Sequence, residues 1–155
     1  MPEISTFATL LHSLTAVIWV GGMFFAYVIL RPSLGFLDPP QRLTIWANVF
    51  KRFFVWVWVI VFILPLTGYA QVIIDFGGFE NVGMHITLMH MTGWAMIALF
   101  VYLFVGPYGS FQACVAAADW PAAAGHLNVI RRIVGTNTVL GIVTAAIGAS
   151  GRFWE

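Results

Sequence analysis

The chain has few charged residues and a single cysteine. Charged residues make up 8% of its 155 positions, and hydrophobic residues make up 61%. Soluble domains carry about 25% charged residues. No polar stretch is long enough to form a separate soluble domain, so we expect one transmembrane domain over residues 1–155. The lone Cys114 excludes an internal disulfide and any cysteine-based zinc or iron–sulfur cluster within one chain.

The apolar segments contain no acidic residue, since all six Asp and Glu residues lie outside them. A proton pump or an ion-coupled transporter normally places carboxylates within the membrane, so coupled transport is not expected. No glycine-rich nucleotide-binding motif follows a strand pattern. We also expect no nucleic-acid partner.

Four apolar segments are long enough to cross a bilayer, which takes about 20 residues. They predict an all-α, four-helix transmembrane bundle with helices at roughly 5–30, 46–74, 84–106 and 127–151. Arg31-Pro32 is expected to end the first helix, and Gly106-Pro107 the third. A short interfacial helix is expected between the third and fourth.

Basic residues are concentrated on one side of the predicted bundle. Six of the seven Lys and Arg residues flank the first and third connections: Arg31, Arg42, Lys51, Arg52, Arg131 and Arg132. By the positive-inside rule, these connections are cytoplasmic. Both termini are therefore expected on the outer, periplasmic side of a bacterial inner membrane.

Two of the four histidines are predicted to lie at the same depth. His12 and His90 follow the outer starts of their helices by about 10 and 9 Å at the helical rise. Ionisable side chains inside a membrane are functional-site candidates. Two imidazoles from different helices can hold a b-type haem, so His12 and His90 are predicted ligands of haem iron. The alternative is two buried histidines hydrogen-bonded to backbone or hydroxyl groups. His126 is expected far away, at the cytoplasmic start of the fourth helix.

Small residues are expected around the histidine pair. Thr144 and Gly148 of the fourth helix lie at its level, where they either allow close helix packing or leave room for a flat macrocycle. Arg152 is the only cation on the outer side and is either an end-of-helix anchor or a partner of haem propionates. These three are candidate cofactor-binding residues. Asn137, on the same stripe, is expected to hydrogen-bond between helices.

A second group of residues favours copper. Met84, His85 and Met89 lie at the outer start of the third helix, and thioether and imidazole groups suit Cu(I). At about 100° per residue, His85 shares a face with Met89 and Met96 but points about 140° away from His90. The alternatives are an interfacial histidine and methionines that fill gaps in the core.

Three segments carry a resemblance to a known family. These segments are LHSLTAVIWVGGMFFAYVILRP, RFFVWVWVIVFILPLTGY and HLNVIRRIVGTNTVLGIVTAAIGASGR. In this order, they resemble the first, second and fourth helices of the CopD-domain family of bacterial membrane proteins. The resemblance implies a small four-helix protein or the membrane part of a larger copper-resistance protein. HemJ-type protoporphyrinogen oxidases, which bind haem b, are relatives. Resemblance to them implies a haem ligand at His12 and calls for a lysine near Thr92, where this chain has none.

These features predict a membrane-bound b-type cytochrome with an electron-transfer or oxidoreductase role at the periplasmic side. Two imidazole ligands leave no open iron position, which favours electron transfer over oxygen chemistry. A quinone or a periplasmic redox protein would exchange the electrons, membrane lipid surrounds the bundle, and a homo-oligomer is left open. The alternatives are a copper-handling protein that uses the Met/His cluster, a HemJ-like protoporphyrinogen oxidase, and a structural subunit without a metal.

Overall fold

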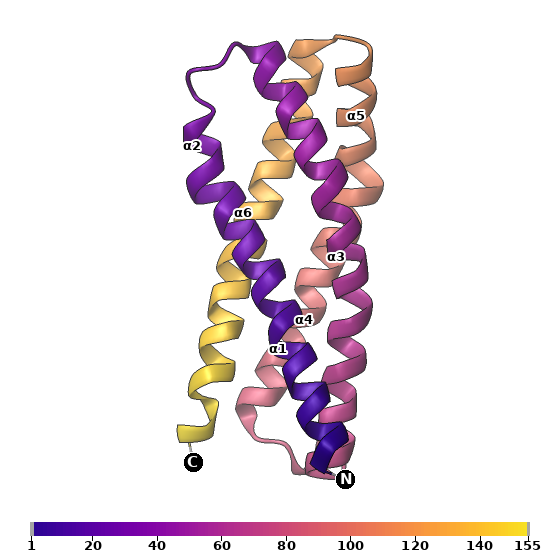
Figure 1. Cartoon of the computed structure of the whole chain (residues 1–155), viewed down its shortest axis with the longest axis vertical. Coiled ribbons are helices and arrows are strands. Elements are labelled where there is room, and N and C mark those ends of the chain that lie inside the picture. Colours follow the sequence, from indigo (N-terminus) through magenta and orange to yellow (C-terminus); the bar gives the residue numbers. More distant parts are fainter. Residues whose placement is uncertain (1, 155) are drawn as a thin grey trace.

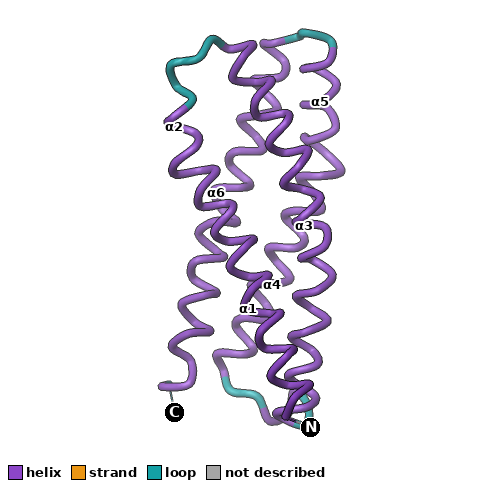
Figure 2. Tube along the Cα trace, in the orientation of Figure 1, coloured by secondary structure: helices purple, strands orange, loops and turns teal. Residues whose placement is uncertain are grey.

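The computed structural model describes residues 2–154, apart from the side chains of Pro2 and Arg152, and the described part of the chain is helical with no strand (Figure 2). Four helical rods run side by side (Figure 1), and each is long and apolar enough to cross a membrane. The rods are Glu3–Ser33, Pro39–Phe76, Met84–Ala116 and Trp120–Ser150. A helix satisfies its backbone hydrogen bonds internally, as a bilayer requires. The predicted all-α, four-helix bundle is confirmed.

The rods consist of α-helices interrupted by short π-helical segments. In chain order, the elements are α1 (Pro2–Phe24), the π-helix η1 (Phe25–Leu30), α2 (Arg31–Ser33), α3 (Pro39–Phe76), the 3₁₀-helix η2 (Phe79–Asn81), α4 (Met84–Leu103), the π-helix η3 (Phe104–Tyr108), α5 (Gly109–Ala116), α6 (Trp120–Ser150) and the 3₁₀-helix η4 (Gly151–Phe153).

Of the two helix ends predicted at proline, one is confirmed and one is wrong. The first rod ends at Ser33, directly after Arg31-Pro32, whereas the third continues through Gly106-Pro107 to Ala116. In each rod, a π-helical segment lies next to the proline or contains it. The wider π turn accommodates a ring and a missing N–H that would break a regular α turn. The expected separate interfacial helix is therefore the end of the third rod.

Two predicted helix starts are also wrong. α3 and α6 begin at Pro39 and Trp120 instead of near residues 46 and 127. Each has proline in its first turn, where the missing N–H costs nothing. The Asp119 side chain caps α6 by accepting a hydrogen bond from the backbone N–H of Ala122 at 3.1 Å. These turns are too polar to show up in a search for apolar segments.

The helices extend beyond the hydrocarbon layer at one end. α3 has 38 residues, roughly 57 Å at the helical rise, whereas the hydrocarbon core is about 30 Å thick. The exposed Lys51 and Arg52 lie several turns inside α3, as Arg131 and Arg132 do in α6. We refer to the end that carries these cations as the basic end. Both chain termini lie at the opposite end, the termini end (Figure 1). Which end faces the cytoplasm stays a prediction.

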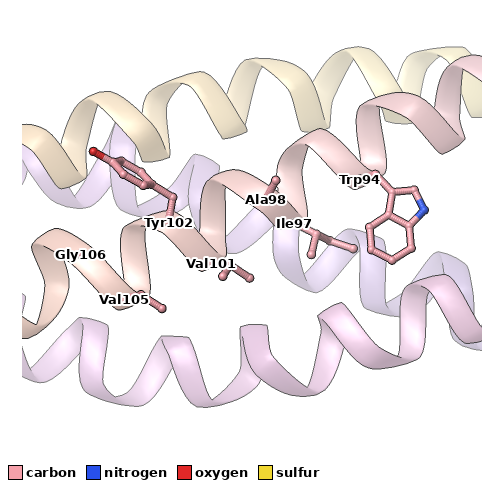
Figure 3. Close-up of a pocket in the computed structure, with 7 residues that line it drawn as sticks. All are labelled: Trp94, Ile97, Ala98, Val101, Tyr102, Val105 and Gly106. Atoms are coloured by element: carbon pink, nitrogen blue, oxygen red, sulfur yellow. The ribbon is translucent and has the colours of Figure 1, made fainter.

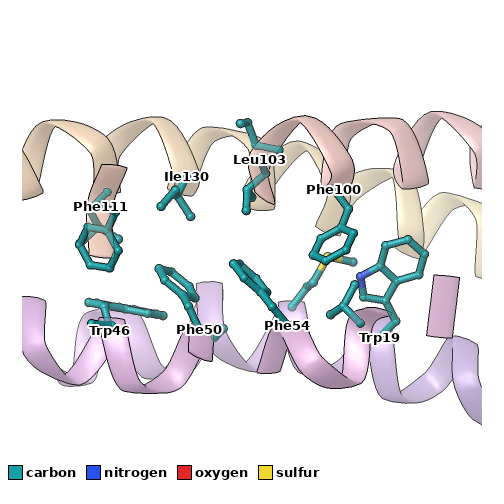
Figure 4. Packing of buried hydrophobic residues seen from close by; sticks show 14 of the residues in the cluster. Trp19, Trp46, Phe50, Phe54, Phe100, Leu103, Phe111 and Ile130 are labelled. Atoms are coloured by element: carbon teal, nitrogen blue, oxygen red, sulfur yellow. The ribbon is translucent and has the colours of Figure 1, made fainter. Parts of the chain in front are cut away.

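Aromatic rings pack inside the bundle, as Figure 4 shows for Trp46, Phe50, Phe54, Phe100 and Phe111. Phe50 and Phe54 of α3 stack with ring centroids 5.2 Å apart. Phe100 of α4 meets Phe54 edge-on at 5.5 Å, and Phe111 of α5 is fully buried against Phe50. Offset and edge-on contacts are the favourable arrangements of aromatic pairs. The candidate site lies in the half of the bundle near the termini end, where His12 contacts Thr67 and Thr144 contacts Thr92.

The four rods form two closely packed pairs. α1 packs chiefly against α3, and α4 packs chiefly against α6. α1 and α3 also contact α6. His12 of α1 and His90 of α4 therefore lie in different helix pairs.

Candidate functional site

His12 is held against α3 by its Nδ1 atom. This atom lies 3.1 Å from the carbonyl oxygen of Leu64 and 3.0 Å from the hydroxyl oxygen of Thr67. The Thr67 hydroxyl donates to the Ile63 carbonyl at 2.7 Å, and a carbonyl oxygen only accepts, so Nδ1 of the neutral ring carries the hydrogen. Nε2 is then the unprotonated nitrogen, the one that can bind a metal. Gly68 permits the approach, because a Cβ there would lie 3.3 Å from Cε1 of His12.

His90 is surrounded by aromatic rings. Its ring centroid lies 5.4 Å from that of Tyr69 in α3, 5.2 Å from that of Phe79 in η2 and 6.4 Å from that of Trp94 in α4. Tyr69 and Phe79 were not foreseen from the sequence, because they come from other elements and follow no motif. The rings restrict the orientation of the imidazole.

His12 and His90 lie at one level of α3 but on different faces of it. His12 contacts Thr67 and Gly68, whereas His90 contacts Tyr69. At about 100° per residue, Tyr69 points away from the face that holds His12. The predicted shared depth is therefore present, and the two rings occupy separate surroundings. Joint binding of one haem iron by these histidines stays a prediction.

The small residues of α6 receive side chains from α4. A Cβ at Gly148 would lie 2.8 Å from Cε of Met89. The hydroxyl oxygens of Thr144 and Thr92 lie 2.7 Å apart. Small residues at these positions let two membrane helices approach closely. Met89 occupies the space beside Gly148 in which a macrocycle was envisaged, and the haem-binding roles of Thr144 and Gly148 stay predictions.

The interhelical hydrogen bond predicted for Asn137 is present. The Asn137 side chain is buried, and its Nδ2 donates to the backbone carbonyl oxygen of Met96 at 3.1 Å. Its Oδ1 is buried and has no hydrogen-bond partner. Asn137 thus joins α6 to α4 at the middle of the bundle.

His85 and Met89 lie in the seam between α4 and α6. The His85 ring packs against the backbone of Gly151, where a Cβ would overlap the ring. Its centroid lies 6.4 Å from that of Trp154. Met89 follows one helical turn later against Gly148, so the predicted shared face of His85 and Met89 is confirmed. Met84 is 69% exposed and lies outside this seam.

Arg152 and His126 are the two remaining residues that the sequence singled out. The side chain of Arg152 lies outside the described residues, and its contact with haem propionates stays a prediction. His126 lies inside α6, because this helix begins at Trp120, so the expectation of a helix-start position is wrong. It is on the half of α6 nearer the basic end.

An open apolar groove borders the surroundings of His90. It has a volume of about 630 Å³ and runs along α4 and η3 from Trp94 to Gly106. Figure 3 shows Trp94, Ile97, Val101 and Val105 along one side of this helix. With so few polar atoms in its lining, the groove suits a hydrocarbon chain and not a polar substrate.

Within the described residues, no three or more His, Cys, Asp or Glu side chains are placed to hold a metal ion. A haem held by two imidazoles, or an ion held by an imidazole and a thioether, requires a different set of ligands. The ligand pairs to consider are therefore His12 with His90, and His85 with Met89.

The spans and their intramembrane histidines and methionines define a multi-pass α-helical membrane protein. A family model described as Copper resistance protein D (CopD) matches residues 47–150, and the chain belongs to this family. The match includes His85, Met89 and His90 and begins after His12. Neither a curated protein nor a solved structure matches the chain.

Proposed function

We propose that the protein handles copper by binding Cu(I) through His85 and Met89. The observation that carries the proposal is that both side chains lie on one face of α4, within its seam with α6. Imidazole nitrogen and thioether sulfur are both suitable ligands of Cu(I). The description of the family, Copper resistance protein D, agrees with this chemistry.

The packing of the seam supports convergence of the two ligands. Residues four apart on a helix have Cβ atoms about 5–6 Å apart, which lets two side chains reach one ion. Met89 is fixed against Gly148, with its sulfur 3.1 Å from where a Cβ of that residue would lie. The His85 ring packs against Gly151, and its centroid lies 6.4 Å from that of Trp154. Ligands held in place by packing lose little conformational freedom when the ion binds.

The charge of the seam favours a monovalent ion. Neither α4 nor α6 contains an acidic residue, so imidazole and thioether form a neutral ligand set. A buried dication without a carboxylate would carry two uncompensated charges, whereas Cu(I) carries one. Both the missing carboxylates and the soft ligands of the seam therefore favour Cu(I) over a divalent ion. Met96 is the next sulfur on this face and packs against Gly141, about 10 Å deeper at the helical rise, too far to bind the same ion.

Anaerobic titration of the detergent-purified protein with Cu(I), against a chromophoric chelator, tests the proposal. His85→Ala and Met89→Leu are each expected to weaken binding by more than about tenfold, since even outer partners of metal ligands contribute roughly that much. Met91→Leu is the control, because Met91 is 64% exposed and lies on another face. Unchanged affinity in both seam variants would contradict the proposal.

A haem b site at His12 is the second candidate function. It is favoured by the hydrogen bond from Nδ1 to Leu64, which leaves Nε2 free in the way that metal-binding histidines are oriented. With His90 as the other ligand, the protein would be a b-type cytochrome of a bacterial inner membrane. A bound haem supplies one-electron chemistry, with a quinone or a periplasmic redox protein as the partner. α4 has no lysine near Thr92, so no observation favours protoporphyrinogen oxidation.

An optical spectrum before and after dithionite reduction, with metal analysis of the same sample, separates the two candidates. Split visible bands that disappear in His12→Ala and His90→Ala would support the cytochrome. A colourless protein that carries copper would support the copper site. Haem retained in both histidine variants would contradict the predicted ligands.

A further inference from the structure

Two buried hydrogen-bond donors near the basic end have no partner. They are Nε1 of Trp46 in α3 and Nε of Arg131 in α6. Trp46 is 3% exposed. Both residues line one cavity of about 20 Å³, together with Tyr27 and Arg31 from the first rod. A buried donor without an acceptor is costly, so an acceptor from outside the chain is expected in this cavity.

The charged residues that line the cavity are two arginines, Arg31 and Arg131. The charged residues that act on Arg131 are Arg31 and Arg42, and no carboxylate is among them. The guanidinium of Arg31 lies over the ring of Tyr27, with its central carbon 5.2 Å from the ring centroid. Tyr27 belongs to the π-helix η1, a type of segment that is frequent at functional sites. Guanidinium groups without a carboxylate partner favour an oxyanion over a neutral acceptor.

The cavity lies where the helices leave the hydrocarbon layer. The exposed Lys51 and Arg52 follow Trp46 on α3 by little more than one turn and mark this boundary. Phosphate groups of lipids occupy the interfacial layer directly outside the hydrocarbon. A cavity of about 20 Å³ admits a single oxygen, since roughly 10–15 Å³ is enough for one water. The remaining atoms of a larger anion would stay at the mouth, beside Arg31.

We propose that this cavity binds a phosphate group. One phosphate oxygen accepts hydrogen bonds from Nε1 of Trp46 and Nε of Arg131, and Arg31 binds the oxygens that stay outside. The phosphate comes either from a lipid headgroup or from free phosphate, and the chemistry of recognition is the same for both. Its binding joins the first rod, α3 and α6 at the membrane boundary.

Thermal unfolding of the full chain in a phosphate-free maltoside detergent measures this binding. One titration uses inorganic phosphate at constant ionic strength. The other uses phosphatidylglycerol mixed into the micelles, with diacylglycerol as the phosphate-free comparison. Trp46→Phe removes the indole donor, and Arg131→Gln removes the guanidinium. Trp56→Phe and Arg52→Gln are matched controls, because both residues are exposed on α3.

At least one phosphate source is expected to raise the unfolding temperature of the native protein and of both controls. The apparent affinity should fall about tenfold in Trp46→Phe and in Arg131→Gln, as expected for loss of a hydrogen bond to a charged group. Stabilisation by phosphatidylglycerol alone identifies a lipid headgroup as the source, and stabilisation by inorganic phosphate identifies the free anion as sufficient.

Three outcomes would overturn the proposal: no stabilisation by either source, native affinity in the cavity variants, or an equal loss in the controls. If Trp46→Phe or Arg131→Gln does not fold, Arg31→Gln takes its place, because Arg31 is exposed and lines the cavity. Native affinity in Arg31→Gln would then overturn the proposal.

Discussion

Nδ1 of His12 lies 3.1 Å from the carbonyl oxygen of Leu64, and this contact joins the first rod to α3 within the membrane. The interface between α1 and α3 contains further polar contacts. The Thr9 hydroxyl donates to the Gln71 side chain at 3.3 Å, and the Gln71 side chain donates to the backbone carbonyl of Thr67 at 3.2 Å. Polar side chains between membrane helices commonly hydrogen-bond in this way. The direction of the His12 hydrogen bond decides which ring nitrogen is free.

We expect the neutral His12 ring to carry its hydrogen on Nδ1. A carbonyl acceptor 3.1 Å away requires a donor, so the other tautomer would leave two acceptors facing each other. Nitrogen-15 spectra of histidine-labelled protein measure the tautomer, and His12→Gln identifies the resonance. A hydrogen on Nε2 would contradict the assignment and remove the argument for metal binding by His12.

Substitution of three glycines by alanine should affect stability in a definite order. Gly22→Ala should cost about 1–3 kcal/mol, because its Cβ would lie 2.5 Å from the ring of Phe53. Gly148→Ala should cost less, since the flexible end of Met89 can move away. Gly93→Ala should be neutral or stabilising by up to about 1 kcal/mol, because nothing lies within 4 Å and alanine favours helix. Thermal unfolding in detergent measures the order, and equal effects would refute the packing.

The spans could be predicted because a bilayer requires long apolar helices, but their ends could not. Apolar character stops at the membrane boundary, whereas α3 and α6 continue into water as polar helix. A proline inside a helix usually breaks or kinks it, yet η3 contains Pro107 within a continuous rod. A π turn depends on neighbouring packing, so the local sequence gives no sign of it.

The features of the candidate sites could likewise be predicted only where they depend on a single helix. The common face of His85 and Met89 follows from helical periodicity alone, and the structure has it. The aromatic surroundings of His90 and the cavity beside Trp46 depend on how separate helices are rotated against one another. Trp46 and Arg131 lie far apart in the sequence, and no motif connects them. Only their unpartnered donors indicate a further role.

The hydroxyl groups of Thr92 and Thr144 should be energetically coupled. They lie 2.7 Å apart and link α4 to α6 beside Met89. In a double-mutant cycle of Thr92→Val and Thr144→Val, we expect a coupling energy of about 0.6 kcal/mol, the average for hydrogen bonds between membrane helices. Unfolding of the four proteins by a denaturing detergent measures it. Additive effects of the two substitutions would show that the contact contributes nothing.

The orientation of the bundle can be tested through its only cysteine. Cys114→Ala removes the native thiol, and a new cysteine is then placed at one end: Glu3→Cys at the termini end or Ala117→Cys at the basic end, both at exposed positions. The positive-inside rule predicts that a membrane-impermeant maleimide labels intact spheroplasts at residue 3, and at residue 117 only after lysis. His85 and Met89 would then be near the periplasm, where they could receive copper from outside the cell. The reverse labelling would contradict the rule for this chain. It would place the same ligands near the cytoplasm and would put the cavity beside Trp46 in contact with the outer layer of lipid phosphates.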